Sequence, residues 1–196
     1  MTFSAFFIYV CTMTFTPGPN NIMSMSIAGQ RGFRRAMHYS VGVGLGFFLL
    51  LLLAAVFMKL LEAFIPRIEL VMKIIGAAYM LYLAFIIVRD KPHKEKEGKR
   101  HVLRPDSVIT GTLLQFINPK GVLYSITCMG TYVLLVTSSP FVVALYAAGL
   151  AFMGVLSTTL WALCGAVFVN VFSKHKKIIN LLLALLLVYC VVTLFL

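Results

Sequence analysis

Thr16-Pro17-Gly18-Pro19-Asn20-Asn21 interrupts the first of several long apolar stretches in this chain, and Asn118-Pro119-Lys120-Gly121 interrupts a later one. Each of these apolar stretches is long enough to cross a bilayer. Irregular backbone at membrane depth is stable only where protein buries it or where it lines a water-filled cavity. The two interruptions therefore predict a site inside the membrane.

The composition around these motifs is that of a membrane protein. Hydrophobic residues make up 61% of the 196 residues and charged residues 12%, with a mean hydropathy of +0.97. An ordinary soluble domain has about 25% charged residues. We therefore predict an all-α integral membrane protein that contacts the lipid bilayer. Six apolar runs are predicted to span it, at residues 2–30, 36–58, 68–88, 107–137, 141–172 and 177–196.

The chain divides into two similar parts. Residues 89–106 are hydrophilic and lack apolar periodicity, so they are predicted to be a charged cytoplasmic linker between repeats at 1–88 and 107–196. Because each repeat has three spans, the second enters the membrane from the opposite side, which predicts a 3+3 inverted repeat. The first span of each repeat carries one interruption. Gly or Asn followed by Pro is typical of a helix start, so each of these spans is expected to be a discontinuous helix.

Positive charges predict the orientation. The first, third and fifth connecting loops carry 13 of the 17 Lys and Arg residues, the second loop carries three and the fourth carries none. The positive-inside rule places the odd loops in the cytoplasm and both termini outside it. The membrane thus explains the net charge of +11, and no nucleic-acid partner is expected.

The apolar interior lacks the groups that most catalytic and metal sites need. All six acidic residues and all four histidines lie in loops or at the ends of predicted spans. This distribution argues against an intramembrane carboxylate relay, a metal site and a Ser-His dyad. We expect no enzyme activity, no metal and no cofactor.

The interruptions instead suit a small zwitterionic amino acid. Half-helices that start at Pro19 and Pro119 would direct free N–H groups and positive dipole ends at the breaks, which favours an anion. Half-helices that end near Phe15 and Ile117 would leave carbonyl groups to accept from an ammonium. The predicted substrate-binding residues are Pro17, Gly18, Pro19, Asn20, Asn21, Asn118, Pro119 and Lys120.

Lys120 is the one basic residue that the motifs place inside a span. The carboxylate of the substrate is its expected partner. Two other interpretations are that the lysine reaches the membrane interface, and that it exchanges a proton against substrate. A structural alternative for both motifs is that their prolines only kink packed helices.

The two motifs resemble those of the lysine-exporter (LysE/RhtB) family of amino-acid efflux proteins. Thr16–Asn20, with the following Gly29-x-x-Gly32 and basic loop, is similar to the hallmark of that family, and Gln115–Lys120 is similar to its second-half motif. The likeness covers the whole chain. Trp161–Gly165 and Ala184–Cys190 are most similar to the branch that exports cysteine and O-acetylserine.

This resemblance implies a secondary transporter that exports small neutral amino acids from the bacterial cytoplasm. It implies a multi-pass protein of the inner membrane with periplasmic termini, driven by the proton-motive force, so that protons are a second partner. A homodimer is an open alternative for the assembly.

The cysteines allow a second interpretation. All four lie inside predicted spans without Cys-x-x-Cys spacing, so reduced structural thiols are expected. The alternative is a membrane thiol or electron carrier that uses Cys11 and Cys128, one in the first span of each repeat. An ion channel is disfavoured, because the sequence has no rings of charge and no repeated carbonyl filter motif.

Overall fold

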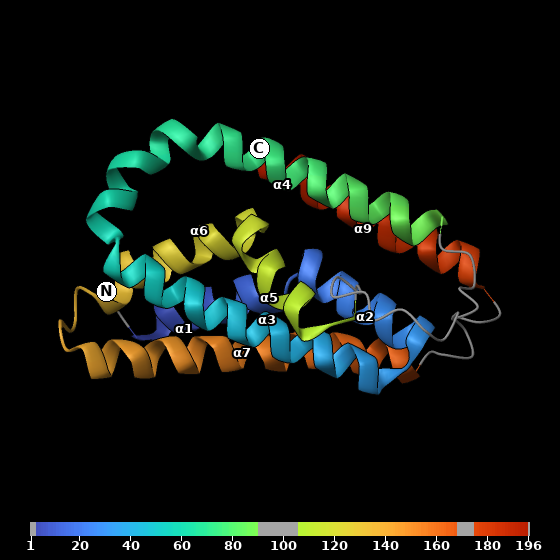
Figure 1. Cartoon of the computed structure of the whole chain (residues 1–196), viewed down its shortest axis with the longest axis horizontal. Helices are drawn as coiled ribbons and strands as arrows, with labels where there is room; N and C mark the ends of the chain where they lie inside the picture. Colours follow the sequence, from blue (N-terminus) through green and yellow to red (C-terminus); the bar gives the residue numbers. More distant parts are fainter. Residues whose placement is uncertain (1–2, 90–105, 168–174, 196) are drawn as a thin grey trace.

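The computed structural model describes residues 3–89, 106–167 and 175–195, and every regular element in these ranges is a helix (Figure 1). The first half contains α1 (Phe3–Phe15), α2 (Pro19–Arg31), α3 (Phe33–Val56) and α4 (Met58–Arg89). The second half contains α5 (Val108–Ile117), α6 (Pro119–Thr127), a π-helix η1 (Cys128–Val133), α7 (Pro140–Val167) and α9 (Lys176–Phe195). The all-α prediction is confirmed. Most of the predicted 89–106 linker and the end of the fifth predicted span lie outside the described residues.

Both helix breaks lie at the predicted motifs. Between α1 and α2, Gly18 is the N-cap of α2 with extended backbone (φ −170°, ψ 170°), and Pro19 is the first helical residue. Asn118 closes α5 and opens α6, again with proline in the first turn. Proline is tolerated there because the first N–H of a helix has no intrahelical partner.

The prediction of a loop between the second and third spans is wrong in its position. Residues 59–67 were expected to connect two spans, but α4 begins at Met58 and runs without interruption to Arg89. Figure 1 shows this helix curving strongly in its N-terminal part. Pro66 lies within α4, and a proline inside a helix removes a backbone hydrogen bond and bends the axis.

Helix α3 is the centre of the packing, with α5 and α7 against it, while α2 packs on α7 and α4 packs on α9. The contact between α3 and α5 requires small residues. A Cβ atom on Gly42 or Gly46 would overlap the carbonyl oxygen of Val108 or Thr112, respectively. The Gly-x-x-x-Gly pattern therefore lets two backbones approach closely, as in other membrane helix pairs.

Buried side chains form two clusters that meet along α3. One joins α2, α3, α4, α7 and α9 and includes Ile22, Tyr39 and Leu187. The other joins α1, α3, α6, η1 and α7 and includes Leu51 and Met129.

The outer surface is apolar. Large hydrophobic side chains of α4 and α9, such as Ile74, Phe85, Leu181 and Val192, are about half exposed or more. Such faces suit lipid contact. In the described ranges, α3 and α7 are each long and apolar enough to cross a membrane, by length and composition.

One end of the bundle carries an ion pair and an interhelical hydrogen bond. The Asp106 carboxylate, before α5, accepts from Arg31 at 3.2 Å and lies 3.6 Å from Arg35. The Asn180 amide, in the first turns of α9, donates to the carbonyl oxygen of Ile87 in the last turns of α4 at 2.7 Å. Gln30, near the end of α2, donates to Asn180 Oδ1 at 3.5 Å, so the end of α2, the end of α4 and the start of α9 lie at the same end of the molecule (Figure 1).

Candidate functional site

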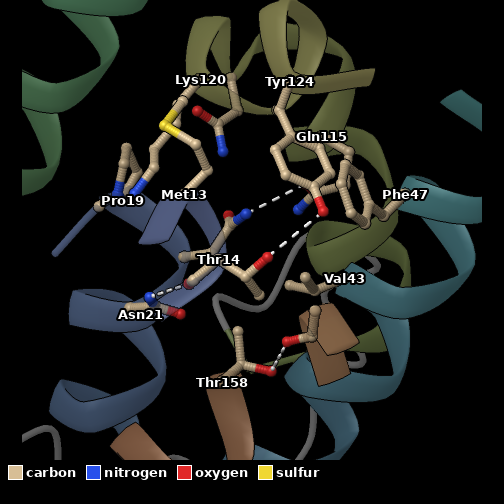
Figure 2. Close-up of a pocket in the computed structure, with 15 residues that line it drawn as sticks. Met13, Thr14, Pro19, Asn21, Val43, Phe47, Gln115, Lys120, Tyr124 and Thr158 are labelled. Carbon is tan, nitrogen blue, oxygen red and sulfur yellow. Dashed lines mark hydrogen bonds between the residues drawn. The ribbon is translucent and has the colours of Figure 1, made fainter. Parts of the chain in front are cut away.

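A cavity of about 60 Å³ lies between the two helix breaks, with room for a few water molecules. Figure 2 shows side chains from α1, α2, α3, α5, α6 and α7 arranged around it. It is lined by Met13, Thr14, Gly18, Pro19, Asn20, Asn21, Val43, Phe47, Gln115, Asn118, Lys120, Gly121, Tyr124, Gly154 and Thr158.

Six of the eight predicted site residues line this cavity, namely Gly18, Pro19, Asn20, Asn21, Asn118 and Lys120. The two others act through the backbone and through packing. Pro17 contributes its carbonyl oxygen to a bond with Lys120. Pro119 is buried, and its ring lies against Gly76 of α4, where a Cβ atom would overlap it. The structure therefore brings both motifs to one place from opposite halves of the chain.

Side chains from α2 and α7 hold the end of α1. The Asn21 amide nitrogen donates to the carbonyl oxygens of Thr14 and Thr16, both at 3.0 Å. Ser157 of α7 donates to the same Thr14 oxygen at 2.8 Å and lies 3.2 Å from the Asn21 amide oxygen. The last carbonyl groups of a helix have no intrahelical donor, and these side chains supply one.

The other two carbonyl groups of this turn, those of Phe15 and Pro17, also have donors. The indole N–H of Trp161 donates to Phe15 O at 3.2 Å, and the Cys190 thiol lies 3.7 Å from Pro17 O. Together with the contacts of Asn21, Ser157 and Lys120, every carbonyl from Thr14 to Pro17 accepts from a side chain. The expectation that the end of α1 leaves its carbonyl groups unsatisfied is therefore wrong, because each of them already accepts at least one hydrogen bond from a side chain.

Lys120 connects the two breaks. Its ammonium group donates to Thr16 O at 3.1 Å, to Thr16 Oγ1 at 2.9 Å and to Pro17 O at 3.2 Å. An ammonium has three N–H groups, so these acceptors match its donors. Gly18 makes room for the lysine, since a Cβ atom there would lie 3.1 Å from Nζ and 3.2 Å from Cδ. The lysine points at the first break and not away to the membrane interface.

A second network joins α2 to α5 across the cavity. The Asn20 amide nitrogen donates to Gln115 Oε1 at 3.0 Å, and Tyr39 donates to Asn20 Oδ1 at 3.3 Å. The Gln115 amide nitrogen donates to Gly111 O at 3.3 Å. Gln115 is almost fully buried, so its polar atoms depend on these bonds.

The second break is built differently. The Asn118 side chain makes no capping bond to α6, although asparagine is a good N-cap. Asn118 is 3% exposed, and its Oδ1 atom is buried without a hydrogen-bond partner. The backbone alone continues the chain here, with Asn118 N–H donating to Leu114 O and Asn118 O accepting from Val122 N–H, both at 3.0 Å.

The remaining wall of the cavity is apolar and neutral. Phe47 of α3 and Tyr124 of α6 form one side, with their ring centroids 5.2 Å apart and Val43 next to them, while Met13 lies on the other side, beside Pro19 (Figure 2). Lys120 is the one charged side chain among the lining residues. The cavity thus offers helix N-termini, one cation, neutral amides and a small apolar surface.

Several lining residues were not predicted. Gln115, Thr14 and Thr158 are polar residues in apolar stretches, so a search for such residues would have found them. Phe47 and Val43 carry no such signal, because only the packing of α3 against the broken helices brings them to the cavity.

The cysteines do not form part of this cavity. All four thiols are free in the structure. Cys128 is fully buried in the cluster around η1 and α3, and Cys11 on α1 is partly buried. Neither is a lining residue.

Comparison with known proteins connects this geometry to a family. The family model described as LysE type translocator matches residues 11–196. The chain belongs to the LysE type translocator family. It is accordingly a membrane translocator, and family membership indicates a transporter and not an enzyme.

Individual relatives cover almost the whole length of this translocator. It is similar to the cysteine/O-acetylserine efflux protein of Salmonella paratyphi A, with 38% identity over 195 residues, 100% of this chain and 98% of the relative. Proteins with the same name from Klebsiella pneumoniae and Escherichia coli K12 are each 37% identical, over 96% and 98% of this chain and 94% and 96% of their own lengths. No solved structure matches the chain.

Proposed function

We propose that this translocator exports a small neutral amino acid, of the cysteine or O-acetylserine kind, from the bacterial cytoplasm across the inner membrane. The observation that carries the proposal is the cavity at which the helix breaks of both halves meet. It presents the N-terminal ends of α2 and α6 and the Lys120 cation, which favour a carboxylate. The names of relatives similar over nearly their whole length support the substrate class.

The proposed architecture is a six-span 3+3 inverted repeat. Each half has the same order of elements, a broken helix followed by two further helices. The helix ends that carry the Arg31–Asp106 and Asn180–Ile87 contacts directly precede or follow, in sequence, the first, third and fifth loops, which carry most of the positive charge. The positive-inside rule favours a cytoplasmic position for this end and periplasmic termini. Rocking of one half against the other would open the cavity to each side in turn.

The proton-motive force is the proposed energy source. The lining residues include no acid, and Lys120 is the one basic side chain among them. A proton exchanged at this amine would accompany the passage of substrate.

Export from cells tests the proposal. Cells that overproduce the protein should resist inhibitory L-cysteine and accumulate more of it, or of O-acetyl-L-serine, in the medium than control cells. Gly121→Leu should abolish this export, because the cavity lies beside Gly121 and its nearest neighbours would be 3.4 Å or more from a Cβ atom, so the larger side chain would fill the open space. Gly149→Leu is the matched control, since no atom lies within 4 Å of a Cβ atom there.

The same assay separates the thiol-carrier alternative. Replacing both Cys11 and Cys128 with serine should leave amino-acid export unchanged, because neither lines the cavity. Loss of export in this double variant, at normal protein levels in the membrane, would favour the electron carrier.

A further inference from the structure

The two sides of the cavity differ in polarity. Figure 2 shows Pro19 and Lys120 on one side and Phe47 and Val43 on the opposite side. The proposed carboxylate site, at the start of α2, therefore faces an apolar wall. In ligand pockets a few polar groups fix the orientation of the ligand, and the apolar lining receives the rest of it. An amino acid held by its carboxylate would thus direct its side chain at Phe47 and Val43.

The ring of Phe47 is held in place by its neighbours. It lies beside the ring of Tyr124, with the two centroids 5.2 Å apart, and belongs to the second buried cluster. On α7, a Cβ atom at Gly154 would lie only 3.2 Å from Phe47 Cδ1, so the ring already packs against that helix. Phe47 is 7% exposed and lines the cavity, so contacts on two sides restrict its movement away from an incoming group.

The backbone that carries Phe47 is also fixed. Gly46, the preceding residue, lies against α5, where a Cβ atom on it would overlap the carbonyl oxygen of Thr112 and lie 2.8 Å from Gln115 Cγ. Helix α3 therefore has no room to move closer to α5 at this point. Interiors packed at this density accept an additional group only with strain. The ring of Phe47 is thus a rigid boundary of the cavity.

We propose that Phe47 sets the upper limit on the size of the side chain that is transported, an inference that rests on the proposed export function. With the carboxylate at the start of α2, a short side chain would end before the Phe47 ring, whereas an aromatic side chain would overlap it. The small size of the cavity, about 60 Å³, agrees with such a limit. Phe47 is then a specificity-determining residue that acts by excluding larger amino acids.

Truncation of Phe47 tests this limit, because it leaves a space that the ring of L-phenylalanine would fill. Phe47→Ala is the main variant, and Phe47→Leu is the milder one for the case that the larger cavity prevents folding. Phe48→Ala is the matched control, since Phe48 is the next residue of α3, is partly buried and is not a lining residue. Gly154→Ala acts in the opposite direction, because its methyl group would press on the Phe47 ring and narrow the cavity.

The experiment measures competition in proteoliposomes that exchange radiolabelled L-cysteine. The wild-type protein should prefer unlabelled L-cysteine to L-phenylalanine as a competitor. Phe47→Ala should reduce this preference roughly tenfold or more, because the fit of even one methylene group in an apolar pocket changes selectivity by about that factor. Phe48→Ala should retain the preference. Gly154→Ala should weaken competition by O-acetyl-L-serine relative to L-cysteine, since the ester side chain is the longer one.

An unchanged preference in both Phe47 variants would overturn the assignment, as would an equal reduction in Phe48→Ala or a wild-type protein that accepts L-phenylalanine as well as L-cysteine. If the Phe47 variants do not exchange substrate, the thermal stabilisation of each purified variant by the two amino acids gives the same ratio. If neither variant folds, unchanged competition by O-acetyl-L-serine in Gly154→Ala would overturn the assignment. Failure of the wild-type protein to exchange either L-cysteine or O-acetyl-L-serine would instead overturn the proposed function.

Discussion

The ammonium nitrogen of Lys120 lies 2.9 Å from Thr16 Oγ1 and 3.1 Å from the Thr16 carbonyl oxygen, which ties the start of α6 to the end of α1. The two residues are 104 positions apart and belong to the broken helices of opposite halves. The Lys120 ammonium group, which was expected to bind the substrate carboxylate, therefore also has a partner within the protein. A substrate carboxylate that approaches Lys120 would compete with the Thr16 and Pro17 oxygens for the same three N–H groups.

Lys120→Met should lower the free energy of unfolding by about 1–3 kcal/mol, because the Thr16 and Pro17 oxygens lose their charged donor. Lys120→Arg should retain most of the stability. Thermal unfolding of the purified protein in detergent measures both, with Lys177→Met, at an exposed position in α9, as the control. Equal melting temperatures for Lys120→Met and wild type would show that the tie contributes nothing.

The same arginine variant separates binding from proton exchange at Lys120. Arginine stays charged at accessible pH, so it can attract a carboxylate but cannot exchange a proton. If the lysine carries the proton, Lys120→Arg should bind L-cysteine yet fail to concentrate it against a gradient. Wild-type, gradient-driven export by Lys120→Gln would remove this residue from the mechanism.

Pro19→Ala and Pro119→Ala should each reduce transport more than they reduce the amount of protein in the membrane. Alanine supplies an N–H group and allows the broken helix to continue, which withdraws the free N–H groups from the cavity. Pro140→Ala is the control, because Pro140 starts α7 at an exposed position. Normal export by both variants would show that the prolines only bend packed helices.

Asn21→Leu should lower the free energy of unfolding by about 2 kcal/mol or more. The change removes both donated bonds to Thr14 O and Thr16 O and leaves those oxygens with fewer donors in a buried turn. Denaturation in detergent checks this expectation. Thr193→Ala serves for comparison, since its exposed hydroxyl bonds only within α9 and its loss should have little effect.

Gly42→Ala and Gly46→Ala should destabilise the protein, because the added methyl group would meet the backbone of α5. A displaced backbone relaxes less readily than a side chain, so a cost of about 1–3 kcal/mol is expected. Gly149→Ala, with open space around the new methyl group, should be neutral or slightly stabilising. Comparable melting temperatures for all three variants would contradict the close contact of α3 and α5.

The proposed orientation in the membrane predicts which compartment each reporter fusion will detect. A fusion after Leu196 should report a periplasmic C-terminus, and a fusion within residues 89–104 should report the cytoplasm, because the odd loops carry the positive charge. A cytoplasmic C-terminus would overturn both the orientation and the inverted repeat.

The helix breaks could be predicted because their causes are local. Gly18-Pro19 and Asn118-Pro119 each place proline where a helix tolerates it, and no distant contact is needed to start α2 or α6. The start of α4 could not be predicted in this way. Lys59, Glu62, Pro66 and Arg67 read as a loop when hydropathy is the criterion, yet these residues lie in helix. Charged residues do not oppose helix formation, so hydropathy located the apolar span and missed the helix around it.

The candidate site was predictable in its motifs and not in its bonds. Both asparagines of α2 and Lys120 were expected at the cavity, and they line it. The partners of the α1 carbonyls, Ser157 and Trp161, come from α7, more than 140 residues away in sequence. Such pairings depend on tertiary packing, so the motif alone could not predict that those carbonyl groups have donors.

The bracing of four consecutive carbonyls at Thr14 to Pro17 makes the two breaks mechanically unequal. The first break is the more rigid one, because any movement of its backbone must break hydrogen bonds from side chains of three other helices. The second break, where the Asn118 side chain holds nothing, is the compliant joint. We expect amide hydrogen exchange to be faster in the first turn of α6 than in the first turn of α2, so that the two broken helices bend unequally.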